Sequence, residues 1–182
     1  HKHSDTVSDP HNSTRGFFFS HMGWLMVSKD PHVAEAGTRI NCSDLLLDPV
    51  VRWNQRLNPW LNLFCCFVVP GIYGQQRYGS FWDGFLVLGA LRYVVLLHAT
   101  WCVNSVAHKW GGRPYNPTIN PAESGFTALV AAGEGWHNWH HAYPYDYAAS
   151  QDGILLQWNP SKALIDVMAM VGQVSKRKRH LQ

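Results

Sequence analysis

Residues 81–107 read FWDGFLVLGALRYVVLLHATWCVNSVA, and this stretch decides the class of fold. Asp83 and Arg92 are the charged residues among these 27 positions. At about 1.5 Å of rise per residue, a helix of this length is longer than the roughly 30 Å hydrocarbon core of a bilayer. The sequence therefore predicts a transmembrane helix over residues 81–107.

A second uncharged stretch precedes the first one along the chain. Residues 57–74 contain no charged side chain in 18 positions, which is long enough for a transmembrane helix. Pro59 and Pro70 fall within it, and membrane helices tolerate proline better than soluble helices do. The polar turn at residues 75–80 joins the two stretches, so we expect a transmembrane helical hairpin. The alternative is two buried helices of a soluble helical protein.

The distribution of basic residues predicts the orientation of this hairpin. Six Lys or Arg residues precede residue 57 and seven follow residue 107, whereas the turn carries Arg77. Cytoplasmic flanks of membrane helices carry the excess of Lys and Arg. We therefore expect residues 1–56 and 108–182 in the cytosol, with the basic residues 176–179 in a solvated tail near anionic lipid.

The overall composition limits the remaining classes of protein. The chain has 182 residues, of which 46% are hydrophobic and 15% are charged, and this excludes a disordered chain and a coiled coil. Its formal net charge of +3 is too small for a nucleic-acid-binding domain, so we expect no nucleic-acid partner. Eleven histidines are an excess that needs an explanation, because histidine is the common metal ligand at neutral pH.

The histidines gather at helical spacing in residues 133–141, which read GEGWHNWHH. His137, His140 and His141 share one face of the helix that we expect over residues 126–141, so three imidazoles converge as metal ligands. Asn104 and His108 are four residues apart and also share a helical face. Imidazole suits zinc, copper, iron and nickel, so residue chemistry alone leaves the metal open. We expect His98 to be a buried structural histidine bonded to a neighbouring helix.

Five segments of the chain resemble the membrane acyl-CoA desaturases of the stearoyl-CoA Δ9 type. Residues 1–12, HKHSDTVSDPHN, resemble the end of the second histidine box of that family, H-R-x-H-H-K-(Y/F)-S-(D/E)-T, and its sequel. Residues 15–24, RGFFFSHMGW, follow as in the family pattern, and residues 100–108, TWCVNSVAH, resemble its N-S-x-x-H segment. Residues 133–141 resemble the third box, G-E-G-x-H-N-x-H-H, and residues 143–147, YPYDY, resemble its F-P-x-D-Y tail.

The resemblance implies an all-α integral membrane protein with a cytosolic helical cap around a histidine-ligated centre of two iron ions. It implies a multi-pass enzyme of the endoplasmic reticulum membrane whose active site faces the cytosol. Such an enzyme inserts a cis double bond, at Δ9 in this type, into a saturated fatty acyl-CoA. It uses O₂ as co-substrate and two electrons that cytochrome b5 delivers from its reductase.

The resemblance also implies roles for single residues. The iron ligands that it implies are His1, Asn104 through a water, His108, His137, His140 and His141. Trp24 and Lys29 match positions along the acyl-CoA path, with Lys29 on the CoA side, and Thr100 and Trp101 match residues that line the acyl tunnel. Glu134 and Asn138 are further candidates that would orient the imidazole rings.

The chain also departs from the family pattern. The first histidine box, the first two spans and most of the second box have no counterpart in residues 1–182, so we expect a partial desaturase domain that is inactive alone. Ser28 stands where family members often carry Arg, and we treat His3 as a non-ligand. The alternatives are a related histidine-box fatty acid hydroxylase, a desaturase of other regioselectivity, or a non-catalytic membrane protein that binds metal.

Overall fold

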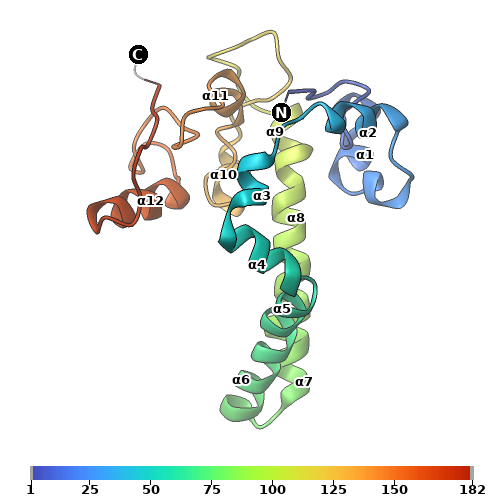
Figure 1. The fold of residues 1–182 in the computed structure, drawn as a ribbon, viewed down its shortest axis with the longest axis vertical. Helices are drawn as coiled ribbons and strands as arrows, with labels where there is room; N and C mark the ends of the chain where they lie inside the picture. The colour runs from blue at the N-terminus through green and yellow to red at the C-terminus, as the bar shows by residue number, and fades with distance from the viewer. Residues whose placement is uncertain (1, 181–182) are drawn as a thin grey trace. The chain divides into compact units, whose positions relative to one another are not determined.

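The computed structural model describes residues 2–180 (Figure 1), and this part of the chain is helical with no strand. Isolated backbone bridges pair Glu123 with Gly112 and with Trp136. The predicted all-α class is therefore confirmed for the described residues. In chain order the helices are η1 (Ser13–Arg15), α1 (Phe17–His21), η2 (Gly23–Met26), α2 (Pro31–Thr38), α3 (Ser43–Leu47), α4 (Pro49–Leu57), α5 (Trp60–Leu63), η3 (Phe64–Val68), α6 (Val69–Tyr78), α7 (Phe81–Asp83), η4 (Gly84–Leu91), α8 (Arg92–Asn104), α9 (Val106–Lys109), α10 (Gly125–Val130), α11 (His137–Ala142) and α12 (Pro160–Met170).

The chain divides into two compact units. The first unit joins the chain up to Ala34 with the chain from His98 onward, and the second unit is Glu35–Leu97. All the described candidate ligands lie in the first unit. The second unit contains most of the helical hairpin.

The longest helix of the chain runs from Phe81 to Lys109 through α7, η4, α8 and α9. Its 29 residues have a mean hydropathy of 1.7 over the most apolar window, and 11% of that window is buried. By length and composition this helix can cross a membrane. The preceding helices Pro49–Leu57 and Trp60–Tyr78 pass the same test together, but they meet at an angle of 73°.

The two helices of the hairpin touch through glycines. Gly79, with a φ of 77°, ends α6 in the left-handed conformation that favours glycine and turns the chain into α7. The hairpin is the green segment of Figure 1, where α6 and α7 lie side by side. A Cβ atom on Gly74 would stand 2.5 Å from the Cα atom of Gly84, so the two backbones are in direct contact. Small residues allow this close approach, as they do in packed membrane helices.

Arg92 places a charge within the long apolar helix. Its Nε donates to the carbonyl of Leu88 at 2.8 Å, and one Nη donates to the carbonyl of Cys66 at 3.2 Å. Leu88 belongs to the π-helical segment η4 and Cys66 to the π-helical segment η3. The guanidinium therefore joins the two helices of the hairpin by hydrogen bonds to backbone carbonyls.

One predicted helix is wrong in its extent. The helix expected over residues 126–141 is two helices, α10 and α11, separated by a turn. Ala132 and Gly133 have φ values of 52° and 106°, which no α-helix contains. Gly135 packs so closely on Ala128 that a Cβ atom would lie 2.1 Å from its backbone nitrogen. The turn therefore separates α11 from α10, and its glycines allow both the positive φ and the close packing on Ala128.

The last helix and the tail complete the first unit. The side chain of Asn159 accepts a hydrogen bond from the backbone nitrogen of Lys162 and caps α12, as the Asn-Pro start signal predicts. The tail is not simply solvated, which corrects the expectation for residues 176–179. Lys176 and Lys178 are exposed, but Arg177 pairs with Asp166, and the half-buried Arg179 is hydrogen-bonded within the unit.

Candidate metal centre

Helix α11 brings the three histidines of the GEGWHNWHH segment to one place. The helix begins at His137, so His140 and His141 follow one turn later. A carboxylate from another segment satisfies its first turn, since Glu123 Oε1 accepts a hydrogen bond from the backbone nitrogen of Trp139 at 2.8 Å. A six-residue helix is not stable alone. Its position therefore depends on such contacts.

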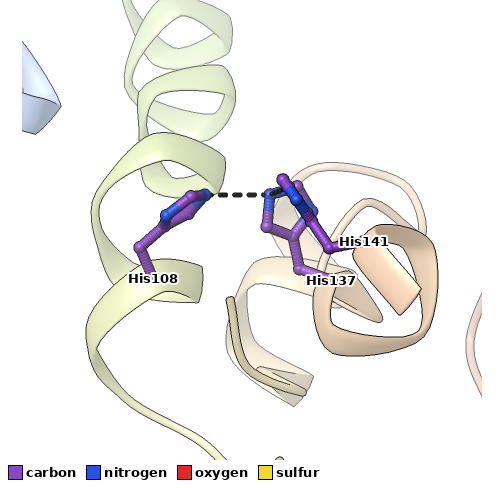
Figure 2. A group of neighbouring side chains, drawn as sticks. All are labelled: His108, His137 and His141. Carbon is purple, nitrogen blue, oxygen red and sulfur yellow. Dashed lines mark hydrogen bonds between the residues drawn. The ribbon is translucent and has the colours of Figure 1, made fainter. Parts of the chain in front are cut away.

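His108 approaches α11 from the end of the long helix. Ser105 interrupts the helical geometry with φ −114° and ψ −66°, and its hydroxyl donates to the carbonyl of Trp101 at 2.8 Å. Serine back-bonding of this kind bends helices. Beyond the interruption, the buried His108 points toward α11 (Figure 2).

Three imidazoles converge in the first unit. The Nε2 atom of His137 lies 3.1 Å from Nε2 of His108 and 3.1 Å from Nε2 of His141. One ligand atom from each of the three side chains lies within 4.8 Å of the others. Figure 2 shows the rings of His137 and His141 on one helix facing His108 on the other.

This geometry favours a shared cation over a shared proton. A neutral imidazole nitrogen either donates one proton or accepts through one lone pair, so His137 Nε2 satisfies one neighbour well and the second poorly. A metal ion accepts all the lone pairs at once. For metal–nitrogen bonds of about 2.1 Å, two ligands at a right angle are about 3.0 Å apart, close to the spacing found here. The donor set therefore fits a metal ion that prefers imidazole.

Asp5 supports His108 from behind. Its Oδ2 atom lies 2.9 Å from Nδ1 of His108, and its Oδ1 accepts hydrogen bonds from the backbone nitrogen and hydroxyl of Ser13. Burial raises the pKa of this carboxyl, but the hydrogen bonds from His108 and Ser13 outweigh it and hold the pKa well below its usual range. A carboxylate that accepts from Nδ1–H leaves the Nε2 lone pair free for a metal.

The histidines of α11 are neutral at physiological pH. Burial and the neighbouring imidazoles of His141 and His108 lower the pKa of His137 well below its ordinary value. Burial, with His108 as the next cause, lowers the pKa of His141 to about 3. Burial also lowers the pKa of His140. Neutral imidazoles present the lone pairs that metal binding requires.

The other predicted ligands lie around this group. The ring of His140 is centred 5.7 Å from the rings of both His137 and His141, and it is not in the group of three whose ligand atoms converge. Asn104 ends α8, four residues before His108 and on the far side of the interruption at Ser105. His1 lies outside the described residues.

Asn138 has a different role from the one expected. Its Oδ1 accepts hydrogen bonds from the backbone nitrogens of Tyr115 and Asn116 at 2.9 and 3.0 Å. Its Nδ2 donates to the carbonyls of Asn116 and Pro121, both at 2.9 Å. An amide has two acceptor sites and two donor protons, so none is left for an imidazole. Asn138 therefore ties α11 to the loop before Glu123 instead of orienting the rings, and Glu134, the other candidate, is exposed.

The chain is similar to known acyl-CoA desaturases. The chain is 46% identical over 180 residues to stearoyl-CoA desaturase 5 of Bos taurus, with 98% of this chain and 53% of the relative aligned. It is 45% identical over 183 residues to the Δ9-fatty-acid desaturase fat-6 of Caenorhabditis elegans, covering 98% of this chain and 52% of the relative. Over 98% of its length, the chain is therefore similar to acyl-CoA desaturases of the stearoyl-CoA and Δ9 types.

Further relatives show the same extent of alignment. An acyl-CoA desaturase of Cyprinus carpio is 46% identical over 180 residues, with 98% of this chain and 55% of the relative aligned. No family model matches the chain. The chain spans about half the length of the curated relatives it matches.

Trp24 and Lys29 line one cavity of about 380 Å³. Arg15 also lines it, so two cations border the same space. The indole nitrogen of Trp24 is buried and has no hydrogen-bond partner among the described residues, while its ring meets the edge of the His11 ring at 5.7 Å. The two residues predicted for the acyl-CoA path are therefore neighbours in the first unit.

Thr100 and Trp101, the residues predicted for the acyl tunnel, lie together on α8. The Trp101 ring packs edge-on against His98 at 5.0 Å and against His21 at 5.7 Å. His98 is bonded to a neighbouring helix as predicted, since its Nδ1 lies 3.0 Å from Nε2 of His21 on α1. It is exposed, however, so the expectation of burial is wrong for this chain.

Two carboxylates near the site were not predicted from the sequence. Asp5 stands 103 positions from its partner His108, and no spacing rule connects residues so far apart. Glu123 lies in a loop rich in Pro and Asn, where a charged side chain is expected to be solvated. Asp5 could have been suspected from the sequence, because it belongs to the His-Lys-His-Ser-Asp run. Metal-bound histidines commonly donate a hydrogen bond to a carboxylate.

Proposed function

We propose that the protein containing this chain inserts a cis double bond, at Δ9, into a saturated fatty acyl-CoA in the biosynthesis of unsaturated fatty acids. The observation that supports this most is the convergence of three imidazole Nε2 atoms in a chain about 45% identical to Δ9 desaturases. The reaction is an oxidation that uses O₂, so the protein is an oxidoreductase.

The site would hold two iron ions, and His108, His137 and His141 are the ligands that the geometry favours. His140, His1 and Asn104 complete the proposed set, Asn104 through a water. Iron supplies the activation of O₂ that breaking an unactivated C–H bond requires, which no side chain provides. The chain's own residues hold the imidazoles in place, through Asp5 behind His108 and Glu123 at the first turn of α11.

The acyl-CoA would lie along two pairs of residues, Trp24 with Lys29 and Thr100 with Trp101. Lys29 and Arg15 border one cavity and suit the phosphates of CoA. Trp24 lines that same cavity. Thr100 and Trp101 would line the dry path of the alkyl chain, where an aromatic wall suits methylenes. The fixed wall would decide which carbon faces the metal site.

The atoms of the reaction require an outside source of electrons. The acyl chain loses two hydrogens, and O₂ is reduced to two molecules of water. This balance needs two further electrons and two protons, and we assign the electrons to cytochrome b5 and its reductase. The helix Phe81–Lys109 would anchor the protein as a multi-pass protein of the endoplasmic reticulum membrane, with the metal site on the cytosolic side.

The test is expression of the full protein in cells that lack Δ9 desaturase activity, with fatty acids analysed by mass spectrometry. We expect new Δ9 monounsaturated acids with the wild type and none with H137A. H32A is the matched control, because His32, in α2, is an exposed histidine bonded to Asp30, and it should keep full activity. Hydroxylated acids would identify a hydroxylase, and bound iron without any new product would identify a non-catalytic metal protein.

A further inference from the structure

The end of the described chain packs on the helix that carries the candidate ligands. The ring of His180 stacks on the ring of Tyr143 at 3.6 Å, with an angle of 12° between the planes. Tyr143 in turn packs on Trp139 at 4.6 Å, and Trp139 is 1% exposed. Trp139 belongs to α11 and stands between His137 and His140 in the sequence. The tail therefore reaches the core of the metal-site helix through an aromatic column.

A buried carboxylate joins the same elements by hydrogen bonds. Asp146 is 3% exposed, and its Oδ2 accepts from the indole Nε1 of Trp139 at 3.3 Å and from the backbone nitrogen of His180 at 3.1 Å. Its Oδ1 accepts from the backbone nitrogen of Ala148 at 2.9 Å and lies 3.7 Å from Nη1 of Arg179. One side chain thus links α11, the turn after it and the tail.

Further contacts hold the tail against the segment that follows α11. The guanidinium of Arg179 donates to the carbonyls of Ser150 and Gln151 at 3.1 and 2.8 Å. The backbone nitrogen of Tyr147 donates to the carbonyl of Lys178 at 3.0 Å. The Tyr145 hydroxyl lies 2.7 Å from Nδ1 of His180. These bonds involve side chains and backbone alike, so they specify one position for the tail.

We propose that residues 177–180 form a strap that positions α11, with Arg179 and His180 as positioning residues for the imidazoles of His137 and His141. The proposal rests on the proposed function in one respect, that these histidines bind a metal. Helix α11 has six residues and takes its position from its contacts. Glu123 and Asn138 hold its first turn, and the strap packs on Trp139 within the helix and on Tyr143, the residue that directly follows its last turn.

The strap matters because metal binding tolerates little displacement. Ligand distances in metal sites vary by only about 0.2 Å. Loss of the aromatic column or of the Asp146 contacts would let the last turn of α11 move, and His141 lies in that turn. Groups that orient ligands from outside typically contribute 10- to 100-fold to metal affinity. The strap contacts the helix that carries the ligands and not the imidazoles themselves. Its contribution to metal affinity should therefore be about tenfold, the lower end of that range.

The experiment is Co²⁺ binding to the purified full protein in detergent, followed by the visible absorption of the bound ion. We expect R179A and H180A to bind Co²⁺ about tenfold more weakly and to change the absorption spectrum. H180F keeps the aromatic column and should restore the wild-type spectrum. K176A is the matched control, since Lys176 is an exposed cation of the same tail outside the strap, and it should behave as the wild type.

Wild-type affinity and spectrum in R179A and H180A would overturn the proposal. If these variants do not fold, Co²⁺ affinity is measured in R179K instead. Lysine keeps the charge but lacks the planar guanidinium that reaches two carbonyls. A weaker Co²⁺ affinity in R179K supports the strap, and an unchanged one overturns it. Co²⁺ binding does not require desaturation. A wild type that binds Co²⁺ but makes no double bond therefore contradicts the proposed function alone, and unaffected strap variants of an active enzyme contradict the strap alone.

Discussion

Two groups of histidines in the first unit have nearly equal spacing between nitrogen atoms and different surroundings. In the cluster, His137 Nε2 lies 3.1 Å from the Nε2 atoms of both His108 and His141. In the pair, His21 Nε2 lies 3.0 Å from Nδ1 of His98. A distance near 3 Å between imidazoles therefore does not by itself mark a metal site.

The partners behind the rings make the difference. In the pair, each ring nitrogen of His21 has one neighbour, because the second nitrogen lies 2.9 Å from the hydroxyl of Ser105. One proton in each contact therefore makes an ordinary hydrogen bond. The cluster has three imidazole nitrogens within 4.8 Å of one another and a carboxylate, Asp5, bonded to the other nitrogen of His108. Convergence and a supporting carboxylate, more than the number of histidines, indicate the metal centre.

The largest expected effect separates the cluster from the pair directly. H137A removes the central imidazole and should lower iron content and desaturation by more than about 100-fold, beyond the range for groups that only orient ligands. H21A removes the imidazole that lies between Ser105 and His98, and it should keep iron within about twofold of the wild type. Iron per protein, measured by mass spectrometry of the metal, checks both. Equal loss of iron in the two variants would contradict the distinction.

The next effect tests the carboxylate behind the cluster. D5N keeps the size of the side chain but weakens its hydrogen bond from His108, so metal affinity should fall by about 10- to 100-fold. D30N is the matched control, because Asp30 makes a similar contact with Nδ1 of His32 at the surface, 2.6 Å away. Competition with a chromophoric chelator measures the affinity. Unchanged affinity in D5N would remove the main physical difference between the cluster and the pair.

A pH effect tests how the cluster's helix is held. Burial raises the pKa of Glu123 to about 7 from 4.5, against the hydrogen bonds from Trp139 and Asn138. The unfolded chain therefore ionises at lower pH than the folded one, and this contribution to stability is complete below pH 4.5 and lost as the pH rises to about 7. E123Q keeps the acceptor for Trp139 and removes the titration.

Melting temperatures of the purified protein between pH 5 and pH 8 measure this contribution. The wild type should lose several degrees relative to E123Q over that range, since about 1 kcal/mol moves Tm by about 2–4 °C. The histidines of α11 titrate in both proteins, so the difference between the two curves isolates Glu123. Parallel curves would show that Glu123 is not buried at the first turn of α11.

The smallest expected effect is the loss of stability when the contact between His98 and His21 is removed. H98F keeps a ring against Trp101 but removes the contact between His98 and His21, which costs one exposed hydrogen bond. The free energy of unfolding should fall by about 0.5–1 kcal/mol, with iron content unchanged. Chemical denaturation followed by fluorescence measures this change. A loss of iron in H98F would show that the pair contributes to the metal centre.

The sequence predicted the placement of histidines where the spacing is local and missed the partnerships where the contacts are long-range. The spacing of His137 and His141 is a helical spacing, and α11 places both imidazoles as expected. The turn before α11 was missed because Gly133 and Gly135 were interpreted as part of a histidine motif instead of as a break between helices. The partnerships of Asp5 with His108 and of Glu123 with Trp139 depend on the tertiary fold, which periodicity does not contain.

The contact of Gly74 with Gly84 also limits where a substrate can travel. Because Gly84 Cα lies 2.5 Å from the place of a Cβ on Gly74, no side chain separates the two backbones at that point. An alkyl chain is wider than this contact, so a fatty acid cannot pass between the two helices of the hairpin there. The seam is closed to an alkyl chain at that point, so the acyl path proposed above cannot run through it.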